Sequence, residues 1–243
     1  MKPMAMIPRA ASHAAAIENQ YIRRLMSPSS LSILALLVYQ VMIQCGVITV
    51  WRSGLGVAER KSRERADREQ RITAAARLIA EREGWGAVTI RRLADEIEYS
   101  QPVLYSHFEN RDAIVTAVAL EGFGELAKAL RKAGLRSSDR GKALESVAIA
   151  YLTFARQHQA LYEAMFTLPT SLRFAEADSR AELKDGFAAL ASVVAPSRSD
   201  VEVATETFWA ALHGLVELER SGRIRKSARN QRIALVVRAL LES

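Results

Sequence analysis

The chain has 243 residues, a formal net charge of +7 and a single cysteine, Cys45. One cysteine excludes an internal disulfide framework and a zinc site built from cysteines, and it fits a reducing compartment. The positive charge is unevenly placed, with 5 basic and 1 acidic side chains in residues 1–56, 11 and 11 in 57–120, and 18 and 15 in 121–243. Net charge alone therefore does not argue for nucleic acid, and the argument must rest on particular basic residues.

An apolar run without charges fills residues 31–51, and no charged side chain occurs between Arg24 and Arg52. A membrane-spanning helix needs about 20 such residues, so the run is long enough to cross a bilayer. Three interpretations stay open: a membrane anchor, a start codon assigned too far upstream of a protein that begins near Val57, and a buried helix. We treat residues 1–56 as an N-terminal extension.

After residue 57 the pattern predicts an all-α protein, because no stretch alternates apolar and polar residues with β-branched enrichment. A dense charged run, Glu59–Arg71, leads into an apolar helix face over 72–80, and Gly84 is the residue type that a left-handed helix end requires. The charged run is either a solvated helix start or an arm that contacts DNA.

Two short helices separated by a three-residue turn follow Gly84. Thr89 is a suitable N-cap for the first, which carries apolar residues on one face up to Ile97. Ser100 starts the second, where Pro102 is tolerated because first-turn amides have no partner in a helix. Two such helices, packed on a longer preceding helix, predict a helix-turn-helix.

The exposed side of the second helix supplies the candidate DNA contacts, since this helix lies in the major groove with its N-terminal residues at base edges. Gln101 and Val103 would reach bases, Val103 by apolar contact only, while Tyr105 and His107 would hydrogen-bond phosphates. The alternative is that Tyr105 and His107 are ordinary surface residues. The full set of expected DNA-binding residues is Thr89, Arg91, Arg92, Ser100, Gln101, Pro102, Val103, Tyr105, His107 and Arg111.

Five further helices are expected, at about 139–158, 160–167, 175–194, 200–220 and 229–241, from apolar periodicity. The helix over 200–220 is apolar on more than one side, so it needs more than one packing partner. We expect a homodimer formed through the last two helices, about 200–241.

The stretch "AVTIRRLADEIEYSQPVLYSHFENRDAIVTAV" (87–118) resembles the DNA-binding domain of the tetracycline-repressor-like (TetR) family of bacterial regulators. The resemblance implies a three-helix DNA-binding domain, a linking helix and a variable helical domain for ligand binding and dimerisation. We therefore expect a DNA-binding domain over 57–120 and a helical effector-binding and dimerisation domain over 121–243. It also implies DNA contacts for Tyr105, His107 and Arg111. One departure is Glu98, since the family usually has glycine in this turn. Glu98 therefore implies either a strained left-handed residue or a slightly different turn.

The stretch "FWAALHGLVELERSGRI" (208–224) resembles the Trp-x-x-x-His-Gly signature of one TetR subclass. A pocket among these helices would suit an adaptable apolar ligand. Each candidate has a second interpretation, as a core side chain or, for the histidine, as a residue bonded to the backbone. The ligand-pocket candidates are Tyr162, Met165, Phe166, Trp209 and His213.

No Gly-rich phosphate loop, His-Glu-x-x-His or Gly-x-Ser-x-Gly motif occurs, so we expect no enzymatic activity, no cofactor and no metal. The competing hypothesis is a helical adaptor without DNA binding, which the apolar run could tether to a membrane. We expect a homodimeric, ligand-responsive repressor in the cytoplasm, at the nucleoid. Its partners would be double-stranded DNA, a second copy of the chain and a small-molecule effector of unknown identity.

Overall fold

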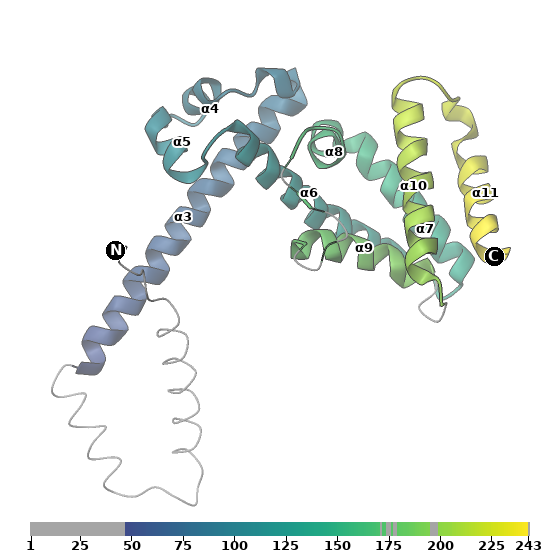
Figure 1. Cartoon of the computed structure of the whole chain (residues 1–243), viewed down its shortest axis with the longest axis horizontal. Coiled ribbons are helices and arrows are strands. Elements are labelled where there is room, and N and C mark those ends of the chain that lie inside the picture. Colours follow the sequence, from purple (N-terminus) through teal and green to yellow (C-terminus); the bar gives the residue numbers. More distant parts are fainter. Residues whose placement is uncertain (1–46, 171, 174–175, 177–178, 195–198, 243) are drawn as a thin grey trace, which may run out of the picture. The chain divides into compact units, whose positions relative to one another are not determined.

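A computed structural model describes residues 47–170, 172–173, 176, 179–194 and 199–242. The described residues form helices and no strands, so the all-α prediction is confirmed. The chain divides into two compact units, Met1–Glu64 and Arg65–Ser243. The second unit contains residues 65–83 of helix α3 (Val47–Glu83) and all the later helices (Figure 1).

The helix-turn-helix comprises α4 (Ile90–Glu96) and α5 (Gln101–His107), which follow α3 (Val47–Glu83) and the short 3-10 helix η1 (Trp85–Ala87). Buried apolar side chains of α3, α4 and α5 share one core with the first turns of α6 (Arg111–Gly134). This core orients the two short helices, which are too short to be stable in isolation.

The ends of these helices follow the signals in the sequence. Gly84 has φ 81° and ψ 162°, a positive-φ conformation that glycine adopts without strain but that differs from the expected left-handed helix cap. The Thr89 hydroxyl accepts a hydrogen bond from the Arg92 amide (3.1 Å), and Asn110 Oδ1 accepts one from the Ala113 amide (2.9 Å). Both caps satisfy amides that a helix leaves without a partner.

The turn between α4 and α5 carries the expected strain. Glu98 has φ 56°, and it is the one non-glycine residue with positive φ among those the structure describes. The Tyr99 amide donates to the Ala94 carbonyl (2.9 Å), which closes the turn around this residue. A left-handed conformation costs a non-glycine residue about 1–2 kcal/mol. The turn therefore keeps the geometry that glycine would adopt, at the expense of local strain.

The C-terminal helices are α7 (Arg140–Gln157), α8 (Gln159–Phe166), α9 (Ala181–Val194), α10 (Val201–Arg220) and α11 (Arg229–Glu242), with the 3-10 helix η2 (Lys226–Ala228) before the last. The linking helix α6 packs against α7, α8 and α9, and α10 packs against α7, α9 and α11. Figure 1 shows α10 and α11 side by side at the C-terminal end of the chain.

The predicted start of α9 at residue 175 is wrong, because the helix begins at Ala181. The Ser179 hydroxyl donates to the Arg173 carbonyl (2.9 Å) and accepts from the Glu176 amide (3.0 Å). Such side-chain bonds to the backbone compete with a helix, which agrees with the non-helical backbone of Arg173, Glu176 and Ser179.

Within the first unit, the described part of α3 carries two i,i+4 ion pairs, Arg60–Glu64 and Glu59–Arg63, each at 3.9 Å. Most of the apolar run over 31–51 lies outside the described residues. No helix in the described part of the chain is long and apolar enough to cross a membrane.

Candidate DNA interface and effector cavity

The recognition helix α5 has one buried and one exposed side. The Leu104 side chain is fully buried in the core of the DNA-binding domain. On the other side, Gln101 and Pro102 are exposed, Val103 keeps 37% of its surface accessible and Tyr105 54%. An exposed tyrosine and valine beside a polar amide form a surface that can contact base edges and phosphates. All four residues belong to the set of DNA contacts predicted from the sequence, and all four are exposed.

His107 is placed differently from the prediction. Its side chain is only 5% exposed, and its Nδ1 atom lies 3.3 Å from the Glu69 carboxylate on α3. The imidazole therefore holds the end of α5 against α3 and does not face solvent. A role for His107 in positioning α5 fits this geometry better than a direct phosphate contact.

Arg111 also makes internal contacts. Its Nε atom donates to the Val88 carbonyl (2.8 Å), and its terminal nitrogen donates to the Trp85 carbonyl (2.7 Å). The guanidinium thus joins the start of α6 to the segment between η1 and α4. The predicted phosphate contact would have to share this cation with two carbonyls, so the main role of Arg111 in this structure is to fix that segment.

Replacing Arg111 with alanine is expected to lower the free energy of unfolding by about 1–3 kcal/mol, because two carbonyls lose a charged donor. Urea unfolding followed by circular dichroism measures the free energy of unfolding, and DNA-binding titrations measure the affinity for DNA. If Arg111→Ala unfolds like the wild type but binds DNA more weakly, Arg111 is a phosphate contact and not a structural residue.

The remaining predicted contacts lie on or beside α4. Arg91 is exposed, whereas the Arg92 guanidinium lies 3.3 Å from Glu83 and 3.5 Å from Glu96. The Thr89 hydroxyl is used as the helix cap. Ser100 is the N-cap of α5, but its side chain makes no capping hydrogen bond. Its hydroxyl is therefore exposed and is not used as a helix cap.

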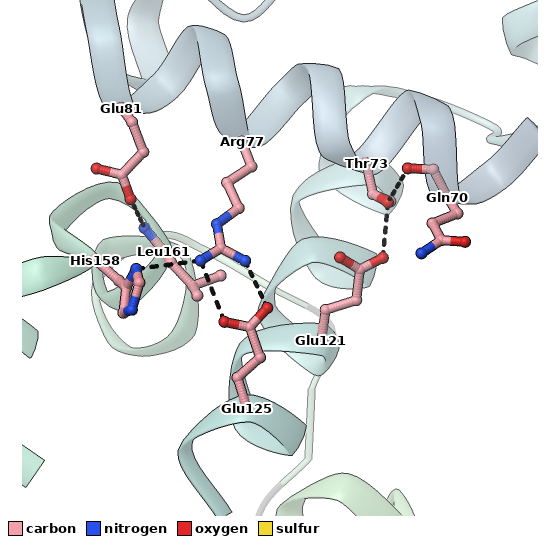
Figure 2. Close-up of polar contacts among 8 residues, drawn as sticks. All are labelled: Gln70, Thr73, Arg77, Glu81, Glu121, Glu125, His158 and Leu161. Atoms are coloured by element: carbon pink, nitrogen blue, oxygen red, sulfur yellow. Dashed lines mark hydrogen bonds and ion pairs between the residues drawn. The ribbon is translucent and has the colours of Figure 1, made fainter. Parts of the chain in front are cut away.

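Polar contacts connect α3 to the C-terminal helices (Figure 2). Arg77 donates to both oxygens of Glu125 on α6 (2.6 and 3.2 Å) and approaches His158 Nδ1 (3.2 Å). The Glu81 carboxylate accepts from the amides of Ala160 (3.3 Å) and Leu161 (3.4 Å) in the first turn of α8. A carboxylate at this position stabilises the helix dipole, so α3 holds the N-terminal end of α8.

Two further contacts strengthen the same connection. The Trp85 indole nitrogen donates to the Ala160 carbonyl (2.7 Å) in a buried setting. The Thr73 hydroxyl lies 2.7 Å from the Glu121 carboxylate on α6 (Figure 2). Helices α6 and α8 are themselves closely packed, since a Cβ atom added at Gly122 would lie 2.7 Å from the Met165 sulfur. A displacement of α8 would therefore change the contacts that α8 makes with α3.

A cavity of about 350 Å³ lies among α6, α7, α8, α9 and α10. Its wall is mainly apolar and aromatic, with several charged side chains. Two of the predicted pocket residues, Phe166 and Trp209, are in the wall. The other lining residues are Phe123, Leu126, Leu130, Tyr151, Glu176, Ser179, Leu183, Lys184, Gly186, Phe187, Leu190, Glu202 and Glu206.

The other three predicted pocket residues are packed behind this wall. Tyr162 and Met165 are buried in the core, and His213 is partly buried. None of the three is among the residues that line the cavity. Tyr151 and the residues of α6 and α9 were missed because apolar periodicity alone does not separate a core side chain from one that borders a cavity.

A chain of hydrogen bonds runs from the cavity wall to His213. The Trp209 indole nitrogen donates to the Tyr151 hydroxyl (3.1 Å), which lies 3.0 Å from the Tyr162 hydroxyl. The Tyr162 hydroxyl lies 2.7 Å from His213 Nδ1. Burial lowers the pKa of His213, which favours the neutral ring with Nδ1 as an acceptor. Each hydroxyl then accepts one hydrogen bond and donates one.

Burial also raises the pKa of Tyr151 and Tyr162, so both hydroxyls stay protonated as this chain requires. The spacing of Trp209 and His213 therefore has a structural reason. Side chains four residues apart on α10 reach the two ends of one tyrosine pair.

The helix pair with an exposed second helix, joined to a helical domain with an internal cavity, defines a helix-turn-helix regulator of the bacterial type. Residues 72–118 match the family model for bacterial regulatory proteins of the tetR family. Residues 144–241 match the model for the tetracyclin repressor-like C-terminal domain. The chain belongs to the TetR family, and it is a DNA-binding transcriptional regulator.

Known relatives agree with this assignment. An uncharacterized HTH-type transcriptional regulator of Mycobacterium tuberculosis, Rv0681, is 29% identical over 154 residues, which cover 62% of this chain and 69% of the relative. A protein of unknown function from Rhodococcus sp. RHA1 has a similar fold, with a TM-score of 0.59 at 20% identity over 72% of this chain and 93% of that one. The TetR family regulator PfmR from Thermus thermophilus gives 0.51 at 19% identity over 69% and 97%.

Proposed function

We propose that this regulator is a ligand-responsive repressor that binds a pseudo-palindromic operator as a homodimer. Each subunit would place α5 in one half-site, with Gln101, Val103 and Tyr105 toward the DNA. The observation that carries the ligand response is the 350 Å³ cavity, whose wall includes Phe166 of α8. The same short helix is held at its other end by Glu81 and Trp85 of the DNA-binding domain.

The coupling would run along α8. This helix has eight residues and a length of about 12 Å, so a ligand that displaces Phe166 would move the first turn as well. That turn contacts Glu81, and His158 just before it contacts Arg77. A ligand that binds the DNA-incompetent arrangement more tightly would release the operator, and a coupling of about 1–3 kcal/mol is typical.

The effector would be a mainly apolar molecule, because aromatic and aliphatic side chains dominate the cavity wall. The packing of Trp209 and His213 on two tyrosines also supports assignment to the Trp-x-x-x-His-Gly subclass. In that assignment the tryptophan and the histidine of the signature would hold the Tyr151–Tyr162 pair by hydrogen bonds at its two ends.

The test of ligand response uses a fluorescent duplex from the region upstream of the regulator's own gene. Compounds that raise the melting temperature of the full chain are added to the preformed complex, and anisotropy reports release. We expect at least one stabilising compound to release the wild type and to act at higher concentration on Trp209→Ala. If compounds that bind the cavity leave the affinity for DNA unchanged, the ligand-responsive part of the proposal fails.

The homodimer would form through the outer face of α10 and α11. Val203 and Leu235 are exposed to 63% and 61% although both are apolar. Between Val203 and Leu218 on α10, a Cβ atom added at Gly214 would meet nothing within 4 Å in the single chain. An apolar face with an open glycine allows a second helix pair to approach closely, as in a four-helix bundle.

A charge on this face is expected to break the dimer. Val203→Glu combined with Leu235→Glu would bury two carboxylates per subunit, so light scattering should give the monomer mass at micromolar concentration. The matched control is Leu135→Glu at the end of α6, where the side chain is 87% exposed and lies on neither helix. A dimer that persists in the double variant would place the interface elsewhere.

A further inference from the structure

Helix α3 continues well upstream of the family domain. The family match begins at residue 72, whereas the helix begins at Val47. Every residue from 56 to 68 is exposed, so no packing against the residues that the structure describes accounts for this part of the helix. A helix that is polar all round needs ion pairs along its length or a partner.

Ion pairs stabilise the helix, but they do not involve all of its arginine side chains. In the second unit, Arg65 pairs with Glu69 one turn later (2.8 Å), and such a pair contributes about 0.2–0.5 kcal/mol. Arg68 and Arg71 are exposed, and neither has an ion pair or side-chain hydrogen bond with the residues that the structure describes. Asp67 lies one turn before Arg71, yet no ion pair within 4 Å joins them.

The three arginines share a side of α3. Arg65, Arg68 and Arg71 are spaced by three residues, and at 3.6 residues per turn they fall within a sector of about 120°. Ile72 and Ala75, the next residues along this sector, are buried in the core with Leu104 of α5. The three arginines therefore lie on the same side of α3 as the residues that pack against α5, but nearer the N-terminus of the helix.

Glu69 connects this arginine face directly to the recognition helix. Its carboxylate contacts Arg65 Nε (2.8 Å) and His107 Nδ1 (3.3 Å), and His107 is the last residue of α5. The arginine face thus begins next to the helix that enters the major groove. Continuity with α5 and positive charge both favour a phosphate backbone as the partner.

We propose that Arg65, Arg68 and Arg71 form a second DNA-contacting surface, which binds backbone phosphates beside the groove that α5 enters. This inference rests on the DNA-binding function of the chain. Guanidinium groups bind phosphate oxygens by paired hydrogen bonds, and such contacts position a protein on DNA without reading its sequence. The surface adds affinity from a segment that lies outside the family domain.

The test compares the salt dependence of DNA binding by the full chain and by Arg68→Gln/Arg71→Gln. A duplex that the wild type selects from random sequences is titrated by fluorescence anisotropy between about 50 and 300 mM salt. Each phosphate contact contributes about 0.9 to the slope of log K against log salt. The double variant should lose about 2 from this slope, keep the same preferred sequence and unfold at the wild-type temperature.

The matched control is Lys132→Gln/Arg136→Gln, which removes two exposed positive charges at the far end of α6. Its slope should equal that of the wild type. An unchanged slope in Arg68→Gln/Arg71→Gln, or an equal loss in the control, overturns the proposed surface. If instead the wild type itself fails to select or bind any duplex, the DNA-binding function fails together with the inference.

Discussion

Replacing Leu104 with alanine should lower the free energy of unfolding of the DNA-binding domain by about 2–5 kcal/mol. Leu104 is fully buried and is the one buried side chain of α5, so its loss leaves a cavity beneath the recognition helix. Operator affinity should fall together with stability, because α5 is no longer held in one position. Urea unfolding followed by circular dichroism gives the first quantity, and anisotropy with labelled DNA gives the second.

The neighbouring residue provides the control. Val103 lies on the exposed side of the same helix, so Val103→Ala should change the free energy of unfolding by less than about 0.5 kcal/mol. It should still weaken specific binding, since its methyl groups are offered to the bases. The account of α5 would be wrong if Leu104→Ala left stability intact or if Val103→Ala destabilised the domain as strongly.

Replacing Glu219 with alanine is expected to lower the free energy of unfolding by about 3 kcal/mol. The carboxylate is buried at the end of α10 and is hydrogen-bonded by Arg229 and Arg232 of α11. Its removal leaves two arginines without their anion. This loss of stability is at the lower end of what the removal of one partner of a buried ion pair causes, because the arginine side chains stay 26% and 21% exposed.

The pH dependence of stability provides a second measurement on Glu219. Burial alone would raise the pKa of this carboxyl, but hydrogen bonds from Arg229 and Arg232 outweigh it and leave the pKa below the ordinary 4.5. A carboxyl with a lowered pKa stabilises the fold above its unfolded-state pKa, and this stability is lost as the pH falls through the folded-state pKa. The wild type should therefore lose stability below about pH 4.5 more steeply than Glu219→Gln.

The control is Glu242→Ala, which removes an exposed carboxylate from the end of α11. It should unfold within about 0.5 kcal/mol of the wild type. Equal stability of Glu219→Ala and the wild type would show that α10 and α11 do not depend on this ion-pair cluster.

Much of the fold was predictable from the sequence because local signals agree with the tertiary structure. The helix expected at 200–220 is found as Val201–Arg220, and the one expected at 229–241 as Arg229–Glu242. Apolar periodicity and capping depend on residues only a few positions apart, so they predict helix bounds without knowledge of the tertiary structure. The strain at Glu98 is confirmed for the same reason, since it depends only on which residue occupies the turn.

The site was less predictable because its contacts are distant in sequence. His107 is bonded to Glu69, 38 residues earlier, and Arg111 to the carbonyls of Val88 and Trp85, 23 and 26 residues earlier. A sequence pattern places these two side chains near DNA but does not show which internal groups compete for them.

In the proposed complex, two copies of α5, held in a dimer, read two half-sites of an operator. The most direct measurement is selection of duplexes from a random pool by the full chain, followed by the mass of the selected complex. We predict a motif of two inverted half-sites, about 10 base pairs apart centre to centre or a multiple of that spacing, bound by an even number of chains. A single asymmetric site bound by one chain, or no enriched sequence at all, would contradict it.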